Sequence, residues 1–400
     1  MKSKKTILWV LAGTIAVIVV VAVARSRANH NATGPAASGP QLLWKFKSDS
    51  GAFVSIALGQ DGAVYAGGSN RIYALSPDGT LKWKTTLAGL LYLAGGNDGN
   101  IYVASSHGLA FGVSSGGNLT WQPSYGLIGF GAPPAIGADG TVIYANTVSD
   151  LFAFRPGSSD RDIWSQSTFR EGMISANTSL PGQAYVGQSQ GRNSPVIWRD
   201  ETIVLPRQHW LHLFNPNGSP DWFTELTSGD LGAAALADDG TIYVPDNNYS
   251  LFAVDRAGHT KWTFQTEGPV LGSAIVGTDG TIFLATSNYV YALAPDGTPK
   301  WQTKAPHMCR TSPALAADGT LYVGGDTSIF AVRSDGSVKW TLRTMMATGS
   351  PTIAGDGTIY LPCGFMWICA VRDEGSPLAK SPWPKMYHDP ANTGRILTAF

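Results

Sequence analysis

The stretch Ser273–Trp301, SAIVGTDGTIFLATSNYVYALAPDGTPKW, contains three short β-type runs and ends on a tryptophan. Two Asp-Gly turns, at Asp279 and Asp296, and a Ser-Asn loop separate these runs. Asp-Gly supplies the positive φ that tight hairpin turns require. The stretch therefore predicts a series of antiparallel hairpins.

Most of the chain repeats this stretch. The first Asp-Gly-type turn of each copy falls at Asp61, Asp98, Asp139, Asp200, Asp239, Asp279, Asp318 and Asp356, with spacings of 37, 41, 61, 39, 40, 39 and 38 residues. Tryptophans that close the copies lie at Trp44, Trp83, Trp121, Trp164, Trp222, Trp262, Trp301 and Trp340. A four-stranded unit repeated about every 40 residues is typical of a β-propeller. The strand runs are apolar on both faces, as expected where each small sheet packs between two others.

We predict an all-β, eight-bladed β-propeller of four-stranded antiparallel blades. Seven blades are the alternative, because the unit around Asp200 has a poor turn and about twenty extra residues, Arg170–Arg192, before its first strand. The first run, Gln41–Phe46, matches a fourth strand and has no earlier strands of its own. The last unit lacks a regular fourth strand. We therefore expect the N-terminal strand to complete the last blade and close the ring.

The N-terminus predicts export. Lys2, Lys4 and Lys5 precede Thr6–Ala24, nineteen residues without a charge, which as a helix would span about 28 Å and so cross a membrane. The lysines favour an orientation with the N-terminus in the cytoplasm. A cleaved signal peptide is the alternative, because Ala22-Val23-Ala24 has the small-x-small form. The predicted divisions are a membrane anchor or signal (1–27), a flexible linker (28–40) and the propeller (41–400), which either interpretation places outside the cytoplasm.

Composition limits the partners. Charged residues are 14% of the chain and the formal net charge is zero. Nucleic-acid binding needs a clustered basic face, and the only cluster of lysines is at the extreme N-terminus. We therefore expect no nucleic-acid partner, and a propeller that is monomeric.

The repeats SPALAADGTLYVGG (312–325) and YALAPDGTPKW (291–301) resemble the PQQ-like, quinoprotein-type propeller repeat. The resemblance covers about residues 41–395, and WPKMYHDPANTGR (383–395) is similar to a C-terminal segment of many such proteins. It implies that the repeat tryptophans dock adjacent blades, namely Trp44, Trp83, Trp121, Trp262, Trp301 and Trp340. The architecture serves alcohol and sugar dehydrogenases, the outer-membrane assembly factor BamB and other exported proteins, so it does not settle function.

A quinoprotein oxidoreductase needs calcium to polarise the quinone and a carboxylate as general base. The chain has no adjacent cysteines, no Cys-x-x-Cys-His haem signature and no glutamate in a recognisable calcium motif. We therefore predict a non-enzyme with no catalytic residues, metal or cofactor. A PQQ- and calcium-dependent oxidoreductase acting on alcohols or sugars is the alternative.

Sulfur-containing residues gather in the last two units, at Met308, Cys309, Met345, Met346, Cys363, Met366 and Cys369. Cys363 is expected to pair with Cys309 or with Cys369, leaving a buried thiol. A soft-metal site for Cu(I) is the less favoured alternative.

The remaining prediction is a binding surface. Loops from fourth to first strands and from second to third strands converge on one mouth of the ring, where aromatic, Arg and Asn residues suit recognition. The predicted ligand-binding residues are Arg170, Glu171, His209, Trp210, Asn248, Tyr249, Tyr289, Arg310 and Trp367, within a wider set that includes Tyr92, His107, Phe130, Asn247, Asn288 and Phe365. We expect a non-catalytic scaffold that binds an envelope protein or a glycan.

Overall fold

The computed structural model describes residues 39–123, 129–146, 150–157, 163–167, 194–270, 272–373, 375–389 and 392–395. The chain divides into two units, 1–38 and 39–400. The predicted membrane helix, most of the linker, the 170–192 insertion and with it Arg170 and Glu171 lie outside the described residues. Among the residues described, no helix has the length and apolar character needed to span a membrane.

The described part of residues 39–400 is built from β-strands. They are β1 (Gln41–Lys47), β2 (Phe53–Leu58), β3 (Val64–Leu75), β4 (Leu81–Gly95), β5 (Ile101–Ser105), β6 (Ala110–Val113), β7 (Leu119–Trp121), β8 (Ala135–Ile136), β9 (Val142–Ala145), β10 (Asp150–Phe154), β11 (Trp164–Ser167), β12 (Val196–Ile197), β13 (Ile203–Arg207), β14 (Trp210–Phe214), β15 (Pro220–Glu225), β16 (Ala235–Leu236), β17 (Ile242–Pro245), β18 (Ser250–Val254), β19 (Thr260–Gln265), β20 (Ile275–Val276), β21 (Ile282–Ala285), β22 (Tyr289–Leu293), β23 (Pro299–Lys304), β24 (Ala314–Leu315), β25 (Leu321–Gly324), β26 (Ser328–Val332), β27 (Val338–Arg343), β28 (Thr352–Ile353), β29 (Thr358–Pro362) and β30 (Trp367–Arg372).

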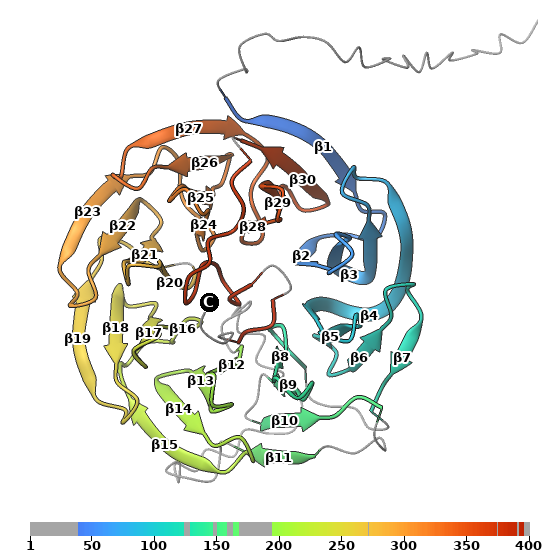
Figure 1. The fold of residues 1–400 in the computed structure, drawn as a ribbon, viewed down its shortest axis with the longest axis horizontal. Helices are drawn as coiled ribbons and strands as arrows, with labels where there is room; N and C mark the ends of the chain where they lie inside the picture. Colours follow the sequence, from blue (N-terminus) through green and yellow to red (C-terminus); the bar gives the residue numbers. More distant parts are fainter. Residues whose placement is uncertain are drawn as a thin grey trace, which may run out of the picture. The chain divides into compact units, whose positions relative to one another are not determined.

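These strands form a β-propeller whose sheets are arranged radially around a common centre (Figure 1). Six sheets have four antiparallel strands, and the seventh has six strands in the order β2-β3-β4-β5-β6-β7. In that sheet Leu81–Thr86 of β4 pair with β3, and Leu91–Gly95 of the same strand pair with β5. The predicted eight blades are therefore corrected to seven sheets, the number given as the alternative, because β4 continues through the position where a loop separates the later repeats.

The N-terminal strand closes the ring, as predicted. β1 pairs with β30 from Gln41 opposite Arg372 to Lys47 opposite Trp367, and the last sheet has the order β1-β30-β29-β28. The first and last parts of the propeller therefore share one sheet, so the ring has no open strand edge at this junction.

The core lies between neighbouring sheets. The inner strands β17, β21 and β25 are buried along their whole length. In the outer strands β19 and β23, half-buried residues alternate with exposed ones. This difference follows from the radial arrangement, because an inner strand is covered on both faces and an outer strand meets solvent.

The repeat tryptophans join one repeat to the next. Trp301 donates a hydrogen bond from Nε1 to Ser334 O at 2.9 Å, and its ring packs against Gly336, where a Cβ would lie 2.9 Å from the indole. The indoles of Trp44, Trp83, Trp222 and Trp262 make the same kind of bond to the following repeat, to Pro77, Ser115, Arg256 and Pro295 respectively. Trp121 instead packs against Tyr144 and Phe154 of the next repeat, and the buried Nε1 of Trp340 has no hydrogen-bond partner among the described residues.

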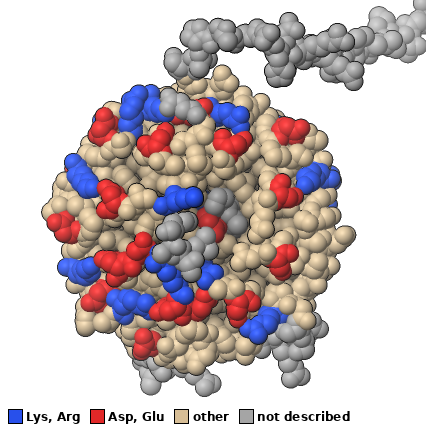
Figure 2. Space-filling model, viewed as in Figure 1, with Lys and Arg blue, Asp and Glu red and all other residues tan. Residues whose placement is uncertain are grey.

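Charged side chains on the surface are largely paired. Asp61, Asp279 and Asp356, each at an Asp-Gly turn, form ion pairs with Lys82, Lys300 and Arg372 of their own repeats. Figure 2 shows one face of the ring, on which basic and acidic side chains lie next to one another around the periphery. Such exposed pairs contribute little to stability, but they leave this face without a large patch of one sign.

The C-terminal segment, residues 375–389 and 392–395, runs through the centre of the ring (Figure 1). Its backbone is hydrogen-bonded to the inner strands of four repeats, through Leu315, Val276, Ile197 and Ile136. The Asn392 side chain donates to Ile56 O and Leu93 O of two further repeats. The described residues of this segment, 383–389 and 392–395, thus form the centre around which the repeats pack.

Candidate binding mouth and axial pocket

The predicted mouth residues lie around the rim and do not form one cluster. Trp210, Tyr289 and Trp367 begin β14, β22 and β30, so each stands directly after a turn between second and third strands. His209 Nδ1 lies 3.1 Å from Gly229 O, and Lys47 Nζ lies 5.6 Å from the centroid of the Trp367 ring. Trp210, Tyr289 and Trp367 belong to three different repeats.

Asn248 and Tyr249 form the tip of a turn in the repeat of β17 and β18. The backbone N–H of Asn248 donates to Asp246 Oδ1 at 3.0 Å. Tyr249 has a φ of 69°, and its side chain is 46% exposed. The turn therefore holds an aromatic ring outward, where it is available to a partner.

Within the mouth, a pocket of about 330 Å³ lies on the axis of the ring. Of the seven residues of the predicted ligand-binding set that the structure describes, Arg310 lines it, together with Tyr92 from the wider mouth set. Its floor comes from the C-terminal segment, through Lys385, Met386, Tyr387 and Asn392. The remaining lining residues are Val54, Ser55, Ile56, Pro133, Gly272, Thr311, Thr348, Gly349, Ser350 and Pro362.

Lys385 is buried at the floor of this pocket. Its Nζ donates to Met386 O at 2.6 Å, Asp389 O at 3.0 Å and Asn392 Oδ1 at 2.7 Å. Burial lowers the pKa of Lys385 to about 7, and the negative charge of Asp389 opposes this shift. All three hydrogen-bond acceptors are uncharged oxygens, so the ammonium group has no carboxylate in direct contact.

Asp389 holds the next turn of the C-terminal segment. It accepts hydrogen bonds from the backbone N–H and the hydroxyl of Thr393, the latter at 2.5 Å. Burial raises the pKa of Asp389, but the neighbouring His388 and the bonds from Thr393 outweigh it, so the pKa lies below its ordinary value. Tyr387, His388 and Asn392 all have positive φ, a strained conformation that the buried hydrogen bonds maintain.

The charge of the pocket is basic. The described residues that line it include Arg310 and Lys385 but no aspartate or glutamate. In the part of the chain that the structure describes, no three His, Cys, Asp or Glu side chains are grouped so that they could hold a metal ion. These residues do not fit the calcium ion and general base of a quinoprotein oxidoreductase, and we derive no step through that cofactor.

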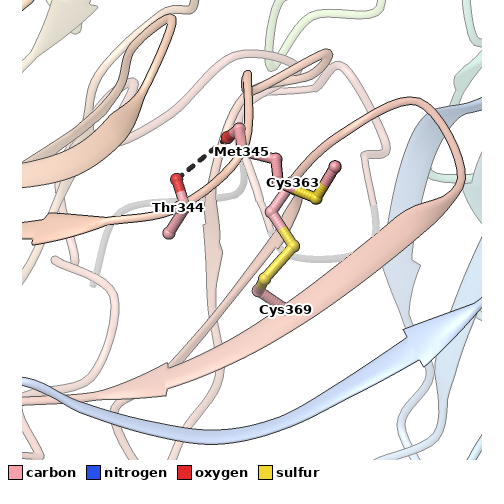
Figure 3. Close-up of a disulfide and its surroundings, with 4 residues drawn as sticks. All are labelled: Thr344, Met345, Cys363 and Cys369. Carbon is pink, nitrogen blue, oxygen red and sulfur yellow. Dashed lines mark hydrogen bonds between the residues drawn. A yellow bond between two sulfur atoms is a disulfide. The ribbon is translucent and has the colours of Figure 1, made fainter.

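Two of the three cysteines pair with each other, and the third is a free thiol. Cys363 and Cys369 form a disulfide across the β29–β30 hairpin, beside Met345 (Figure 3). Cys309 is a buried free thiol, and burial raises its pKa to about 12. Of the two pairings considered for Cys363, the structure contains the one within its own hairpin.

Three residues that contact the C-terminal segment or belong to it were not predicted as site residues from the sequence. Lys385 and Asn392 lie in the stretch 383–395. Its family resemblance can be recognised from the sequence, but its position at the centre of the ring cannot be predicted. Glu201 was visible only as the irregular member of the turn series. In the structure its carboxylate lies 3.1 Å from Arg395 Nη2 of the C-terminal segment.

Comparison with known proteins agrees with this architecture. No curated protein sequence matches the chain. The crystal structure of BamB from Moraxella catarrhalis is similar in fold, with a TM-score of 0.66 at 15% identity, over 84% of this chain and 98% of that chain. The model of the family described as outer membrane protein assembly factor BamB matches residues 35–203 and 268–384, which is more than half of the chain. The chain therefore belongs to this family of PQQ-like propellers.

Proposed function

We propose that the protein is a non-catalytic scaffold outside the cytoplasm, whose mouth binds another protein of the cell envelope. One observation carries the proposal: exposed apolar side chains stand on the mouth loops of a rigid ring. Tyr249, Met308, Met345 and Phe365 are between 45% and 64% exposed. Exposed aromatic and methionine side chains on loops held by a scaffold suit protein recognition.

Three of these side chains belong to the last repeats. Met308 and Met345 lie in successive loops from fourth to first strands, and Phe365 lies in the turn between β29 and β30. Met345 packs beside Gly364, next to Phe365. The backbone of the turn is held in place, because Phe365 O accepts a hydrogen bond from Phe53 N at 3.0 Å. The apolar groups are thus presented by an ordered framework, which limits the entropy lost on binding.

Two features support a location outside the cytoplasm. The uncharged run Thr6–Ala24 after three lysines is suited to membrane targeting, as an anchor or a signal peptide. The Cys363–Cys369 disulfide is typical of proteins from oxidising compartments. A partner in envelope assembly is consistent with the family description.

The test is affinity purification from the native host, with the double variant Met345→Glu/Phe365→Glu. We expect it to lose a specific envelope protein that the wild type retains. Leu119→Glu is the matched control, because Leu119 is 49% exposed on the outer strand β7. Equal retention by the wild type and the double variant would contradict the proposal. If the wild type retains a cell-surface glycan and the double variant does not, the partner is the glycan that the sequence also allows.

A quinoprotein oxidoreductase is tested separately. Purified protein is mixed with PQQ and Ca²⁺ and examined for a bound quinone spectrum and for dye reduction with alcohols or sugars. We expect no dye reduction, because the axial pocket has no carboxylate among its described lining residues to hold Ca²⁺ or to act as the general base. Saturable PQQ binding with turnover would overturn the non-catalytic proposal.

A further inference from the structure

Two basic side chains, Arg310 and Lys385, line the axial pocket, and no carboxylate is among its described lining residues. The Arg310 side chain is exposed and makes no hydrogen bond or ion pair with any described residue. Lys385, at the floor, is 2% exposed and donates only to uncharged oxygens. A buried charge without a carboxylate in hydrogen-bond contact is costly, so an anion in the pocket would stabilise the protonated form of Lys385, and the exposed Arg310 would gain a direct partner.

A second, independent feature also indicates a ligand. Tyr92 lines the pocket and is only 6% exposed, yet its hydroxyl has no hydrogen-bond partner among the described residues. Burial raises the pKa of Tyr92, so the hydroxyl keeps its proton and can donate it in a hydrogen bond. Buried polar groups are normally satisfied by protein, water or a ligand. Tyr92 lines the pocket, and its hydroxyl is not one of the fully enclosed polar atoms, so it can bond water or a ligand.

The kind of anion follows from the donors. A guanidinium group matches a planar carboxylate with two parallel hydrogen bonds, and a tyrosine hydroxyl can add a third. The volume of about 330 Å³ is at the lower end of ligand pockets and admits a small group. We propose that the axial pocket binds a carboxylate group, which Arg310 and Tyr92 contact directly and which the ammonium group of Lys385 attracts.

The carboxylate has two possible sources, a small dicarboxylate or the free C-terminus of a polypeptide. The site itself is independent of the scaffold function, whereas a polypeptide source rests on it. In the second case the exposed Met345 and Phe365 would contact the residues that precede the terminus. The two sources differ in whether an isolated small molecule is sufficient for binding.

The test is isothermal titration calorimetry on the full-length chain. The probes are succinate, its neutral analogue succinamide, inorganic phosphate, and one hexapeptide prepared with a free and with an amidated C-terminus. We expect succinate or the free-acid peptide to bind, and the corresponding amide to bind at least about tenfold more weakly, because charged hydrogen bonds are lost. Binding of succinate identifies a small-molecule source, and binding of the free-acid peptide alone identifies a polypeptide source.

Variants separate the pocket from general charge effects. Arg310→Gln and Tyr92→Phe should weaken binding, the former by about tenfold or more. Arg343→Gln, which removes an exposed guanidinium on β27 outside the pocket, should leave binding unchanged. Melting temperatures of all variants establish that they are folded.

Three outcomes overturn the proposal: no binding of succinate or of either peptide, equal loss in Arg310→Gln and Arg343→Gln, or binding of phosphate as tight as that of the carboxylate. A failure here leaves the scaffold proposal intact, because that proposal depends on Met345 and Phe365 and is measured by partner retention. If no partner is retained but the pocket still binds a carboxylate, the scaffold proposal fails and the carboxylate proposal stands.

Discussion

Glu201 Oε1 lies 3.1 Å from Arg395 Nη2, and this ion pair joins the turn of one repeat to the C-terminal segment. Glu201 occupies the position that glycine occupies in the other first turns, and it has a φ of 64°. A non-glycine residue in this conformation costs about 1 kcal/mol or more. The carboxylate also accepts a hydrogen bond from Ala138 N of the preceding repeat. The strained turn therefore contacts both the C-terminal segment and the preceding repeat, and it links the two.

Replacing Glu201 with glycine should destabilise the protein, although glycine is the residue typical of this turn. The change relieves the positive φ but leaves Arg395, whose side chain is 10% exposed, without its counter-ion. Removing one partner of a buried pair costs about 3–5 kcal/mol, and the 32% exposure of Glu201 reduces this value. We expect Glu201→Gly to lower the free energy of unfolding by about 1–2 kcal/mol, measured by urea denaturation.

The control is Glu201→Gly/Arg395→Met, which also removes the buried positive charge. This double variant should recover part of the lost stability. A Glu201→Gly protein more stable than the wild type would show that the strained turn has no structural benefit.

The strands and turns could be predicted from the sequence because they depend on local residues. The Asp279-Gly280 turn and the apolar run at β21 carry the information for a hairpin within a few residues. Ring closure by β1 was also predictable, because one unit lacked a fourth strand and another segment supplied it. The continuous strand β4 was not, since the Asp-Gly spacing counts repeats and does not show whether two neighbouring repeats share a strand.

The axial pocket could not be predicted, because its floor depends on contacts between distant parts of the chain. Asn392 donates to Ile56 O, a residue more than three hundred positions earlier. A repeat pattern has no signal for such contacts, and the C-terminal motif departs from the pattern. Residue type and loop position predict which side chains lie at the mouth, but they do not distinguish the outer rim from the axis. Of the named ligand-binding set, Arg310 is therefore the member that lines the pocket.

The buried Lys385 should make stability depend on pH. Its pKa is about 7 in the folded protein against an ordinary value of 10.5. Between these values the unfolded chain binds more protons than the folded protein, so the free energy of unfolding should rise with pH. Below pH 7 the group is protonated in both states and contributes no slope. Asp389, with a lowered pKa, and Tyr387, with a pKa raised by burial, do not change charge in the folded state between pH 7 and 9.

Urea denaturation midpoints at pH 7, 8 and 9, in a buffer without carboxylates, measure this effect. The wild type should become more stable across the series, and Lys385→Met should show a smaller slope. An identical slope in the two proteins would mean that another group is responsible.

Trp301 and Trp340 allow the indole hydrogen bond to be separated from ring packing. Trp301 Nε1 donates to Ser334 O, whereas Trp340 Nε1 has no partner in the described structure. Each ring also contacts one aromatic side chain of its own repeat, Phe283 or Tyr322. Trp301→Phe should therefore cost about 1 kcal/mol more than Trp340→Phe, the typical value of one hydrogen bond. Chemical denaturation of both variants measures the difference, and equal losses would assign the role of Trp301 to packing alone.

The Cys363–Cys369 disulfide closes a short loop, with a sequence separation of 6. Loop-closure entropy predicts that it stabilises the protein by about 2 kcal/mol, so Cys363→Ser/Cys369→Ser should lower the free energy of unfolding by this amount. Cys309→Ser is the comparison, because it changes a buried thiol without removing a cross-link.

Thiol titration of the denatured wild type should give one thiol before reduction and three after it. In the native protein Cys309 should be unreactive at neutral pH, because the thiolate is the reactive form and burial raises the pKa of Cys309 to about 12. Three reactive thiols in the unreduced, denatured protein would contradict the disulfide, and with it one of the two features that support a location outside the cytoplasm.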